Sequence, residues 1–414
     1  MPRAGKFSRF LFLFSSLTFF VFQALPLFAD FKLVDAIQEF GEKRFLKTSP
    51  ARIKTGPFRI HPSLRKKAAY DNNILLESQD KREDVVFNIQ PGAIVELPFS
   101  THQIAVGYEA DFEIFSKSRD FRQNDQNQNF FALADIHFPS WYINLLERLS
   151  ETSGRSGTTF TDRIPRIDQS IHPKLGYRWR RAVFEAGFRH SVRDFRRQID
   201  DALDFQLVEW TGVFFYDLFA RLKLLAEYKW AQIDYDDDFR RNGTFQQARV
   251  GLEGEILPNL FLKVRAGPHL RNYYTSSKPD FNSWVGDFRL DYEFRKGFKL
   301  NAKFSREPVE ATFLDVNFFK EHLYQFGAEY KFRPQWTGFS EIRYYRHSYA
   351  ERASLGGRTG FRRDHHLGWK AGVRYLLLEW WELELAYEYL RRDSNFSTFD
   401  YTDHLFSLTS ALAY

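Results

Sequence analysis

The chain has 414 residues, no cysteine, one methionine and a mean hydropathy of −0.47. With 43% apolar and 27% charged residues, it is neither disordered nor built on disulfides or a cysteine-ligated metal. After residue 30 no uncharged stretch reaches the roughly 18 positions of a membrane helix, which excludes a helical membrane protein. Aromatic residues make up 18% of the chain, which favours β-structure with one apolar face.

Residues 1–29 have the form of a secretory signal peptide. An apolar core runs from Phe10 to Phe22, too short to span a bilayer, and Ala29 precedes the predicted cleavage point. Cleavage would remove three of the 59 basic residues and none of the 53 acidic ones, leaving a net charge of +3. The near-balanced charge argues against nucleic-acid binding. The basic start of the segment consists of Arg3, Lys6 and Arg9.

Residues 30–57 are predicted to form an N-terminal leader on the periplasmic side. Val34, Ile37 and Phe40 have a weak helical spacing, which ends at Gly56-Pro57. The leader could plug a lumen, contact a periplasmic partner or stay mobile. We favour the last of these.

From Phe58 to Tyr414 apolar and polar residues alternate with a period of two. Successive side chains of a strand point to opposite faces, so each run predicts an amphipathic strand. The runs are about ten or more residues long, longer than usual strands and suited to crossing a bilayer at a tilt. In one run the polar face holds Gln103, Glu109, Asp111 and Glu113, opposite Ile104, Val106, Tyr108, Ala110, Phe112 and Ile114.

Eighteen such runs follow one another, although sixteen strands would also fit. Short and long connections alternate along the chain, which predicts a transmembrane antiparallel up-and-down β-barrel over residues 58–414. This all-β fold leaves no sheet edge and satisfies every backbone group in lipid. The short connections are expected at Pro98–Ser100, Pro139-Ser140, Arg180-Arg181, Tyr216-Asp217, Leu257–Asn259, Arg295–Gly297, Arg333–Gln335 and Leu377–Glu379. The long ones are expected near residues 71–83, 116–127, 151–169, 194–202, 234–244, 272–282, 307–317, 347–363 and 392–402.

The final run places Phe406, Leu408, Leu412 and Tyr414 on one face, with an aromatic residue last. Outer-membrane barrels commonly end in this way, and we expect the barrel assembly machinery to bind this strand. An ordinary edge strand is the alternative interpretation.

Three short motifs occur in order over the predicted barrel: Tyr70-Asp71-Asn72-Asn73-Ile74, Asn88-Ile89-Gln90-Pro91-Gly92 and Ser305-Arg306-Glu307-Pro308-Val309-Glu310. With these motifs the chain resembles the putative beta-barrel porin 2 family of bacterial outer-membrane proteins. The resemblance implies a porin-like barrel without catalytic residues. Some relatives are linked to exopolysaccharide production, so a role in glycan export stays open.

If the apolar faces meet lipid, the opposite faces line a lumen, and that lumen carries both signs of charge. Basic strands alternate with acidic ones, so opposite charges can pair between neighbours. The charges could set up a field across a water-filled pore, or could simply hydrate the wall and stabilise the strands. The candidate pore-lining residues are Arg59, Arg65, Glu109, Asp111, Arg178, Arg289, Arg374 and Glu384.

Lys66, Glu147 and Glu209 break the alternation, because regular strands would turn them toward lipid. A charge at the centre of a bilayer costs about 2–4 kcal/mol for Lys and less for Glu. We therefore expect β-bulges that reset the face, above all in the strand that contains Glu209.

Other candidate sites are weak. The acidic run Asp234 to Asp238 lacks the spacing of a calcium loop, and His365-His366 should point to opposite faces of a strand. No nucleophile motif is recognisable, so we expect no enzyme activity, cofactor or metal.

Together the patterns predict an outer-membrane barrel of a Gram-negative (diderm) bacterium with both termini in the periplasm. The expected function is passive diffusion of small polar solutes or ions. The alternatives are an outer-membrane component of glycan export and a non-conducting structural barrel. Outer-membrane lipid and lipopolysaccharide are expected partners, nucleic acid is not, and a homo-oligomer is left open.

Overall fold

The computed structural model describes residues 53–117, 125–154, 163–236, 241–275, 280–311, 318–355 and 358–414. The predicted signal peptide, residues 1–29, lies outside the described residues, and so does the leader apart from its last five positions. Three of those positions form a short strand, β1, which pairs with the beginning of β2.

Among the described residues, nineteen strands make up the sheet, and two short 3-10 helices lie in the connections. The bounds are β1 Ile53–Thr55, β2 Phe58–Asp71, β3 Asp84–Phe99, β4 His102–Phe115, β5 Asp125–His137, β6 Trp141–Thr152, β7 Arg166–Trp179, β8 Ala182–Phe195, β9 Phe205–Phe219, β10 Leu222–Tyr235, β11 Gly243–Leu257, β12 Leu260–Tyr273, β13 Phe281–Arg295, β14 Phe298–Glu310, β15 Phe318–Arg333, β16 Trp336–Leu355, β17 Arg358–Leu378, β18 Trp381–Ser394 and β19 Tyr401–Ala413. The 3-10 helices are η3 Gln198–Leu203 and η5 Ser397–Phe399.

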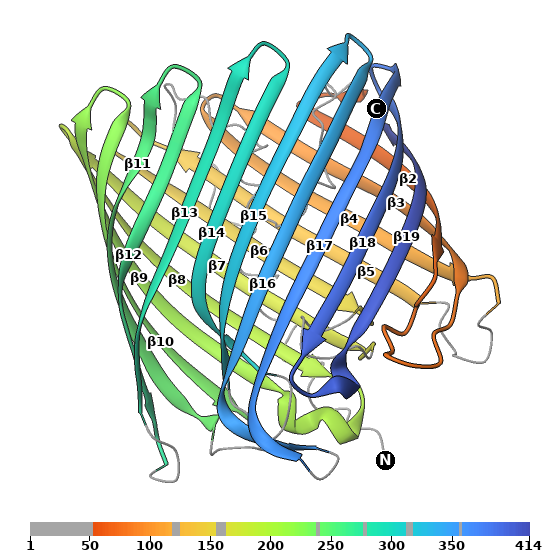
Figure 1. The fold of residues 1–414 in the computed structure, drawn as a ribbon. Helices are drawn as coiled ribbons and strands as arrows, with labels where there is room; N and C mark the ends of the chain where they lie inside the picture. Colours follow the sequence, from red (N-terminus) through yellow and green to blue (C-terminus); the bar gives the residue numbers. More distant parts are fainter. Residues whose placement is uncertain are drawn as a thin grey trace, which may run out of the picture.

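Strands β2 to β19 form a closed barrel. Each pairs antiparallel with the next along the chain, and β19 pairs back onto β2 from Leu405↔Asp71 to Ala413↔Ser63. Figure 1 shows the strands tilted around a wide interior, with the C-terminus at the end that carries the short turns. The predicted up-and-down barrel is confirmed, and its strand count is eighteen when the three-residue β1 is set aside.

Short turns alternate with longer connections as predicted, with one shift. The turn between β9 and β10 lies at Ala220-Arg221, four residues beyond the predicted Tyr216-Asp217. Leu218 and Phe219 extend β9, and the register skips Leu218 in a bulge. Several turns use left-handed backbone, for example Gly297 with φ +81° between β13 and β14.

The predicted long connection at residues 347–363 is wrong. Most of it is strand: β16 and β17 are 20 and 21 residues long and pair up to Leu355↔Arg358. Polar side chains occupy both faces of this extension, so it lacks the apolar stripe that identified the other strands. The register shifts between Ser348 and Arg352, which marks a bulge.

Contacts between strands that are not neighbours identify the inner face. Side chains two strands apart meet on the concave side of a curved sheet, because curvature brings inner side chains together and spreads outer ones. Arg265 of β12 reaches Glu227 of β10 at 2.7 Å, and Arg374 of β17 reaches Glu329 of β15 at 3.3 Å. These contacts identify which of the two alternating sets of side chains in a strand faces inward.

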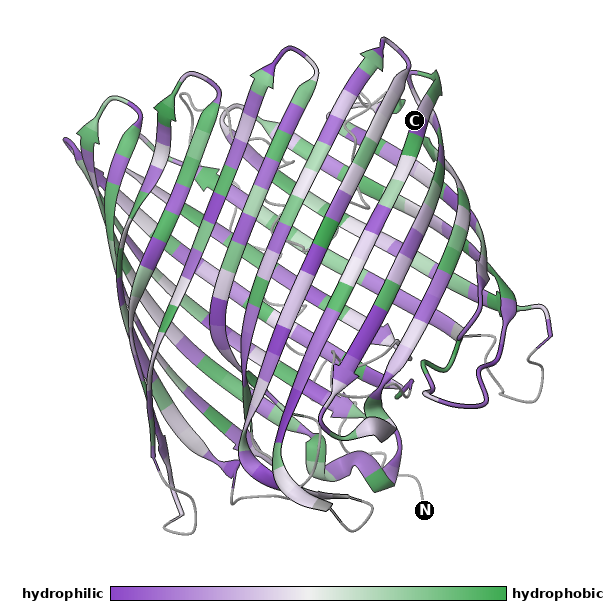
Figure 2. Ribbon diagram, viewed as in Figure 1, coloured by the Kyte–Doolittle hydropathy of each residue, from purple (hydrophilic) through white to green (hydrophobic). Residues whose placement is uncertain are grey.

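The other set of side chains, on the outer face, is apolar and exposed. Figure 2 shows hydrophobic and hydrophilic residues alternating along the strands. Outward-facing Leu385, Phe326 and Val250 are 64%, 60% and 66% exposed, values that suit a surface covered by lipid. Among the described residues, no helix is long and apolar enough to cross a membrane.

Of the three residues that break the alternation, two face outward and one faces inward. Lys66 and Glu147 do face outward from regular strands, so the bulges expected there are wrong. Gln169 donates a hydrogen bond to Glu147 at 3.3 Å, which partly offsets the cost of the carboxylate. Glu209 faces inward, because the outer face of β9 holds its even-numbered residues, such as Trp210. Val213 and Phe215 are apolar and also face inward, so their face was taken for the lipid-facing one.

Strands β13 and β14 pair only over their turn-side parts. Their register runs from Arg295↔Phe298 to Gly286↔Arg306 and no farther. Beyond that point β13 pairs with β12 alone and β14 with β15 alone. The loop-side end of β14 is therefore free to approach the barrel interior.

Candidate functional site

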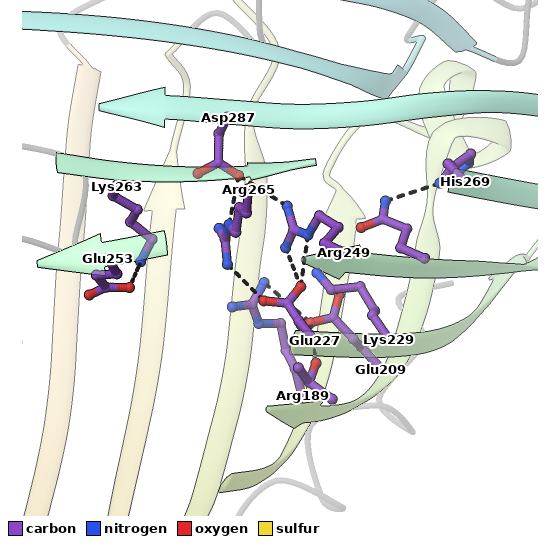
Figure 3. A network of polar contacts seen from close by, with 12 residues as sticks. Arg189, Glu209, Glu227, Lys229, Arg249, Glu253, Lys263, Arg265, His269 and Asp287 are labelled. Carbon is purple, nitrogen blue, oxygen red and sulfur yellow. Dashed lines mark hydrogen bonds and ion pairs between the residues drawn. The ribbon is translucent and has the colours of Figure 1, made fainter. Parts of the chain in front are cut away.

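The inner wall of β10–β13 carries a network of ion pairs (Figure 3). Glu227 accepts hydrogen bonds from Arg249 at 2.9 Å and from Arg265 at 2.7 Å. Asp287 accepts from the same two guanidinium groups, at 3.2 Å and 2.7 Å. Two cations and two anions on four consecutive strands thus neutralise one another against the wall.

The network continues on both sides with simpler pairs. Lys229 lies 3.0 Å from Glu209, which also lies 4.0 Å from Arg189. Nearer the turn end, Lys263 pairs with Glu253 at 2.9 Å, with both side chains about three-tenths exposed. Figure 3 shows these groups lying along neighbouring strands rather than converging on one point.

A second network lies on β15–β18 and contains two of the predicted pore-lining residues. Arg374 bonds to Glu384 at 3.1 Å and to Glu329 at 3.3 Å. Lys370 lies 3.0 Å from the other oxygen of Glu384. The pairing joins the basic inner face of β17 to the acidic inner face of β18, as their sequences indicate.

The other six predicted residues share the inner parity of their strands but do not cluster. Arg59 lies 3.8 Å from Glu96, and Asn88 donates to Asp111 at 3.2 Å. The guanidinium of Arg178 lies 5.3 Å from the ring centre of Tyr142. Arg289 pairs with Asp291, and the register places Arg65 opposite Gln90 and Glu109 opposite Gly92.

At the loop end, the free end of β14 is held against the inner face of other strands. Glu310 accepts from Tyr235 of β10 at 2.8 Å and from Arg271 of β12 at 3.2 Å. Arg241 donates to the carbonyl of Ala311 at 2.6 Å and stacks 4.1 Å from the ring of Tyr235. We call these five residues the rim cluster; it joins strands up to four positions apart.

A further buried group on β16 and β17 contains His347, Asp364 and His366. Each offers one ligand atom within 4.8 Å of the others. Arg362 donates to Oδ1 of Asp364 at 3.0 Å and to Oδ2 at 2.9 Å and 2.6 Å, and Ser394 donates to Oδ1 at 2.6 Å. The cluster is therefore built around a buried salt bridge rather than an open set of ligands. His365 lies on the other face, as alternation predicts, and its ring bonds to Tyr344.

Sequence reasoning missed parts of this inner surface. Opposed charges on neighbouring strands could have identified Glu227–Arg249 and Arg265–Asp287, whose members lie directly opposite each other. The histidine group was hidden because His347 falls in residues 347–363, which were expected to form a loop. No local pattern indicates the contacts of Glu310, which join residues 39 and 75 positions apart.

Comparisons with known proteins place the chain among barrels. The model of a family described as putative beta-barrel porin 2 matches residues 198–414, just over half of the chain. No curated protein matches the chain.

Several solved structures are similar at low sequence identity. The outer membrane protein opdK from Pseudomonas aeruginosa is 10% identical, with 86% of this chain and 99% of that chain covered and a TM-score of 0.48. OccAB3 from Acinetobacter baumannii is 10% identical, covering 87% and 100%, with a TM-score of 0.49. OccK3 (OpdO) from Pseudomonas aeruginosa is 14% identical, covering 86% and 96%, with a TM-score of 0.47. None of the three TM-scores reaches 0.5, so the barrel rests on its own strand pairing.

Proposed function

The chain belongs to the putative beta-barrel porin 2 family, and we propose that this outer-membrane barrel is a passive channel for small hydrophilic solutes and ions. An eighteen-stranded barrel encloses more space than its inward side chains can fill, so water enters the interior. The single observation that carries the proposal is the inner wall itself, with charged pairs spread over β10–β13 and β15–β18. Family and fold point to a channel rather than an enzyme.

The balanced wall predicts weak ion preference. Glu227 and Asp287 are each neutralised by two guanidinium groups, and Glu384 by an ammonium and a guanidinium. A pore lined by one sign of charge would attract ions of the other sign, whereas paired charges of both signs largely cancel at a distance. Arg59, Arg65, Glu109, Asp111, Arg178, Arg289, Arg374 and Glu384 are the proposed contacts for passing solutes.

The proposed orientation puts the short turns and both termini in the periplasm and the longer connections outside, as in bacterial barrels generally. We propose that residues 1–29 direct export and that β19 binds the assembly machinery. Outer-membrane lipid covers the apolar outer face.

Glycan export has less support from the lumen. A conduit for sugar chains benefits from exposed aromatic rings that stack on sugar rings. Two aromatic residues on inward-facing positions, Tyr142 and Phe319, are covered: they are 8% and 1% exposed, and Tyr142 bonds to Glu185.

Swelling of liposomes that contain the purified protein tests the proposal. Small neutral sugars should enter quickly and longer oligosaccharides progressively more slowly, as expected for sieving by size. Uptake of long oligosaccharides at the rate of monosaccharides would favour a glycan conduit. No uptake of any solute by folded protein would contradict the channel.

A further inference from the structure

The outer face of the barrel carries an uneven distribution of cations. From β3 to β13, the loop-end half of the outer face holds no Lys or Arg among the described strand residues. The outward-facing Arg295, which lies opposite Phe298 and 5.2 Å from the ring of Tyr330, stands beside the β13–β14 turn at the other end. Toward the loop end this part of the surface holds amides and carboxylates instead: Gln128, Gln169, Gln206, Gln246, Asn272 and Asn282, together with Glu151, Asp194 and Asp234. The outer face of β14–β18 is different, because arginine and histidine occupy the corresponding part.

Four of these basic residues form one row across adjacent strands. The register places Arg306 opposite His322, His322 opposite Arg346, and Arg346 opposite His365. Neighbouring strands lie about 4.8 Å apart, so the row spans about 15 Å. Arg363, two residues from His365, faces the same way and widens the row toward the loops.

The row has little internal compensation. Arginine alternates with histidine along the row, so its positive charge resides on the arginines. Arg306 stacks 4.2 Å from the ring centre of Trp284 and donates to His322 at 3.0 Å, but neither contact supplies a negative charge. Within the described part of the chain, Arg346 and Arg363 are both exposed and neither forms an ion pair with a carboxylate.

The row also lies at the depth of lipid headgroups. Arg346 comes ten residues after Trp336, which stands next to the β15–β16 turn. Ten residues at about 3.3 Å each, tilted by about 40°, rise about 25 Å, the height of the apolar band of such barrels. Tyr344 and Tyr324 lie on the apolar side of the row, as an aromatic girdle does.

We propose that the outer face of β14–β18 at the loop end is a binding site for the phosphate groups of lipopolysaccharide. Arg306, Arg346 and Arg363 contact the phosphates, and His322 and His365 complete the row. Planar guanidinium groups bind phosphate oxygens with two parallel hydrogen bonds. The positive charge of the row also complements the negative charge of a bisphosphorylated lipid. The proposal uses the orientation proposed above, with the loop end in the outer leaflet.

Binding of lipid A to the full chain, purified in detergent, tests this site. The wild-type protein should bind bisphosphorylated lipid A at least tenfold more tightly than dephosphorylated lipid A. Replacing the arginines together (R306Q/R346Q/R363Q) should remove that preference. Equal affinity for both lipids in the wild type, or an unchanged preference in the triple variant, would overturn the proposal.

The chain offers a matched control in Lys66, an outward-facing cation on β2 outside the row. K66Q should leave lipid A affinity unchanged, whereas R346Q should weaken it severalfold; equal losses would show that only overall charge matters. The triple variant should conduct like the wild type in phospholipid bilayers without lipopolysaccharide, which shows that its barrel is folded. A wild-type barrel that binds lipid A but never conducts would refute the proposed channel and leave this site standing.

Discussion

The two ends of the barrel interior use the same residue types in different ways. On the wall of β10–β13, Glu227 and its arginines lie along consecutive strands, so their contacts follow the curvature of the sheet. In the rim cluster, Glu310 reaches Tyr235 four strands away. Figure 3 shows the first arrangement lying along the wall.

This difference separates two tasks. Ion pairs along the wall set the electrostatic character of the lumen. Contacts between distant strands hold the end of β14 against β10 and β12 at the loop side. We therefore expect changes at the rim cluster to alter the size of the channel, and changes on the wall to alter its ion preference.

The largest effect is expected from Glu310→Ala. Arg271 is only 2% exposed, and leaving a buried charge without its partner costs about 3–5 kcal/mol. The end of β14 should detach from Tyr235, so amide hydrogen exchange of residues 307–310 should accelerate and single-channel conductance should rise. Unchanged exchange and conductance would show that this contact does not hold the mouth. Glu310→Gln keeps an acceptor for Tyr235 and should have a smaller effect.

Glu227→Gln should change the ion preference of the channel more than its conductance. The variant leaves Arg249 and Arg265 with Asp287 alone, which should cost about 2 kcal/mol of stability and make the lumen more positive. The reversal potential under a salt gradient should shift toward anion preference at nearly constant conductance. Glu253→Gln is the control, because its partially exposed pair with Lys263 should give a smaller shift.

Arg289→Gln should separate selectivity from stability. The Arg289–Asp291 pair is exposed, with Arg289 56% accessible, and such pairs contribute less than about 1 kcal/mol. Heat-induced unfolding should stay almost unchanged, while the reversal potential should shift toward cations. A large loss of stability would show that the exposed wall pairs are structural.

The smallest effect concerns pH at the connection between β8 and β9. Burial, together with the nearby Asp194, Asp201 and Asp236, raises the pKa of Asp204 to about 7. The folded state favours the protonated form of Asp204. This preference therefore stabilises the fold fully below the ordinary aspartate pKa near 4, and the stabilisation is lost as pH rises through about 7.

Trypsin cleavage after Arg196 and Arg197 reports on this connection. Cleavage of the wild type should accelerate between pH 6 and pH 8.5 by more than cleavage of Asp204→Asn does, because asparagine stays neutral. The same acceleration in both proteins would exclude Asp204 as the cause.

The sequence predicts the wall better than the rim. Alternation assigns Arg374 and Glu384 to one face because each strand must turn an apolar face to lipid. It fails for Glu209, because Val213 and Phe215 also point inward and mimic an outer stripe. Contacts such as Glu310–Tyr235 depend on how far β14 bends after its pairing with β13 ends, and no local pattern encodes that bend.

Single-channel recording of the purified protein in planar bilayers, under a salt gradient, tests the central claim most directly. An open, charge-balanced lumen predicts steady conductance with a reversal potential close to zero. A demonstrably folded barrel that carries no current would contradict the claim, as would a strongly selective one.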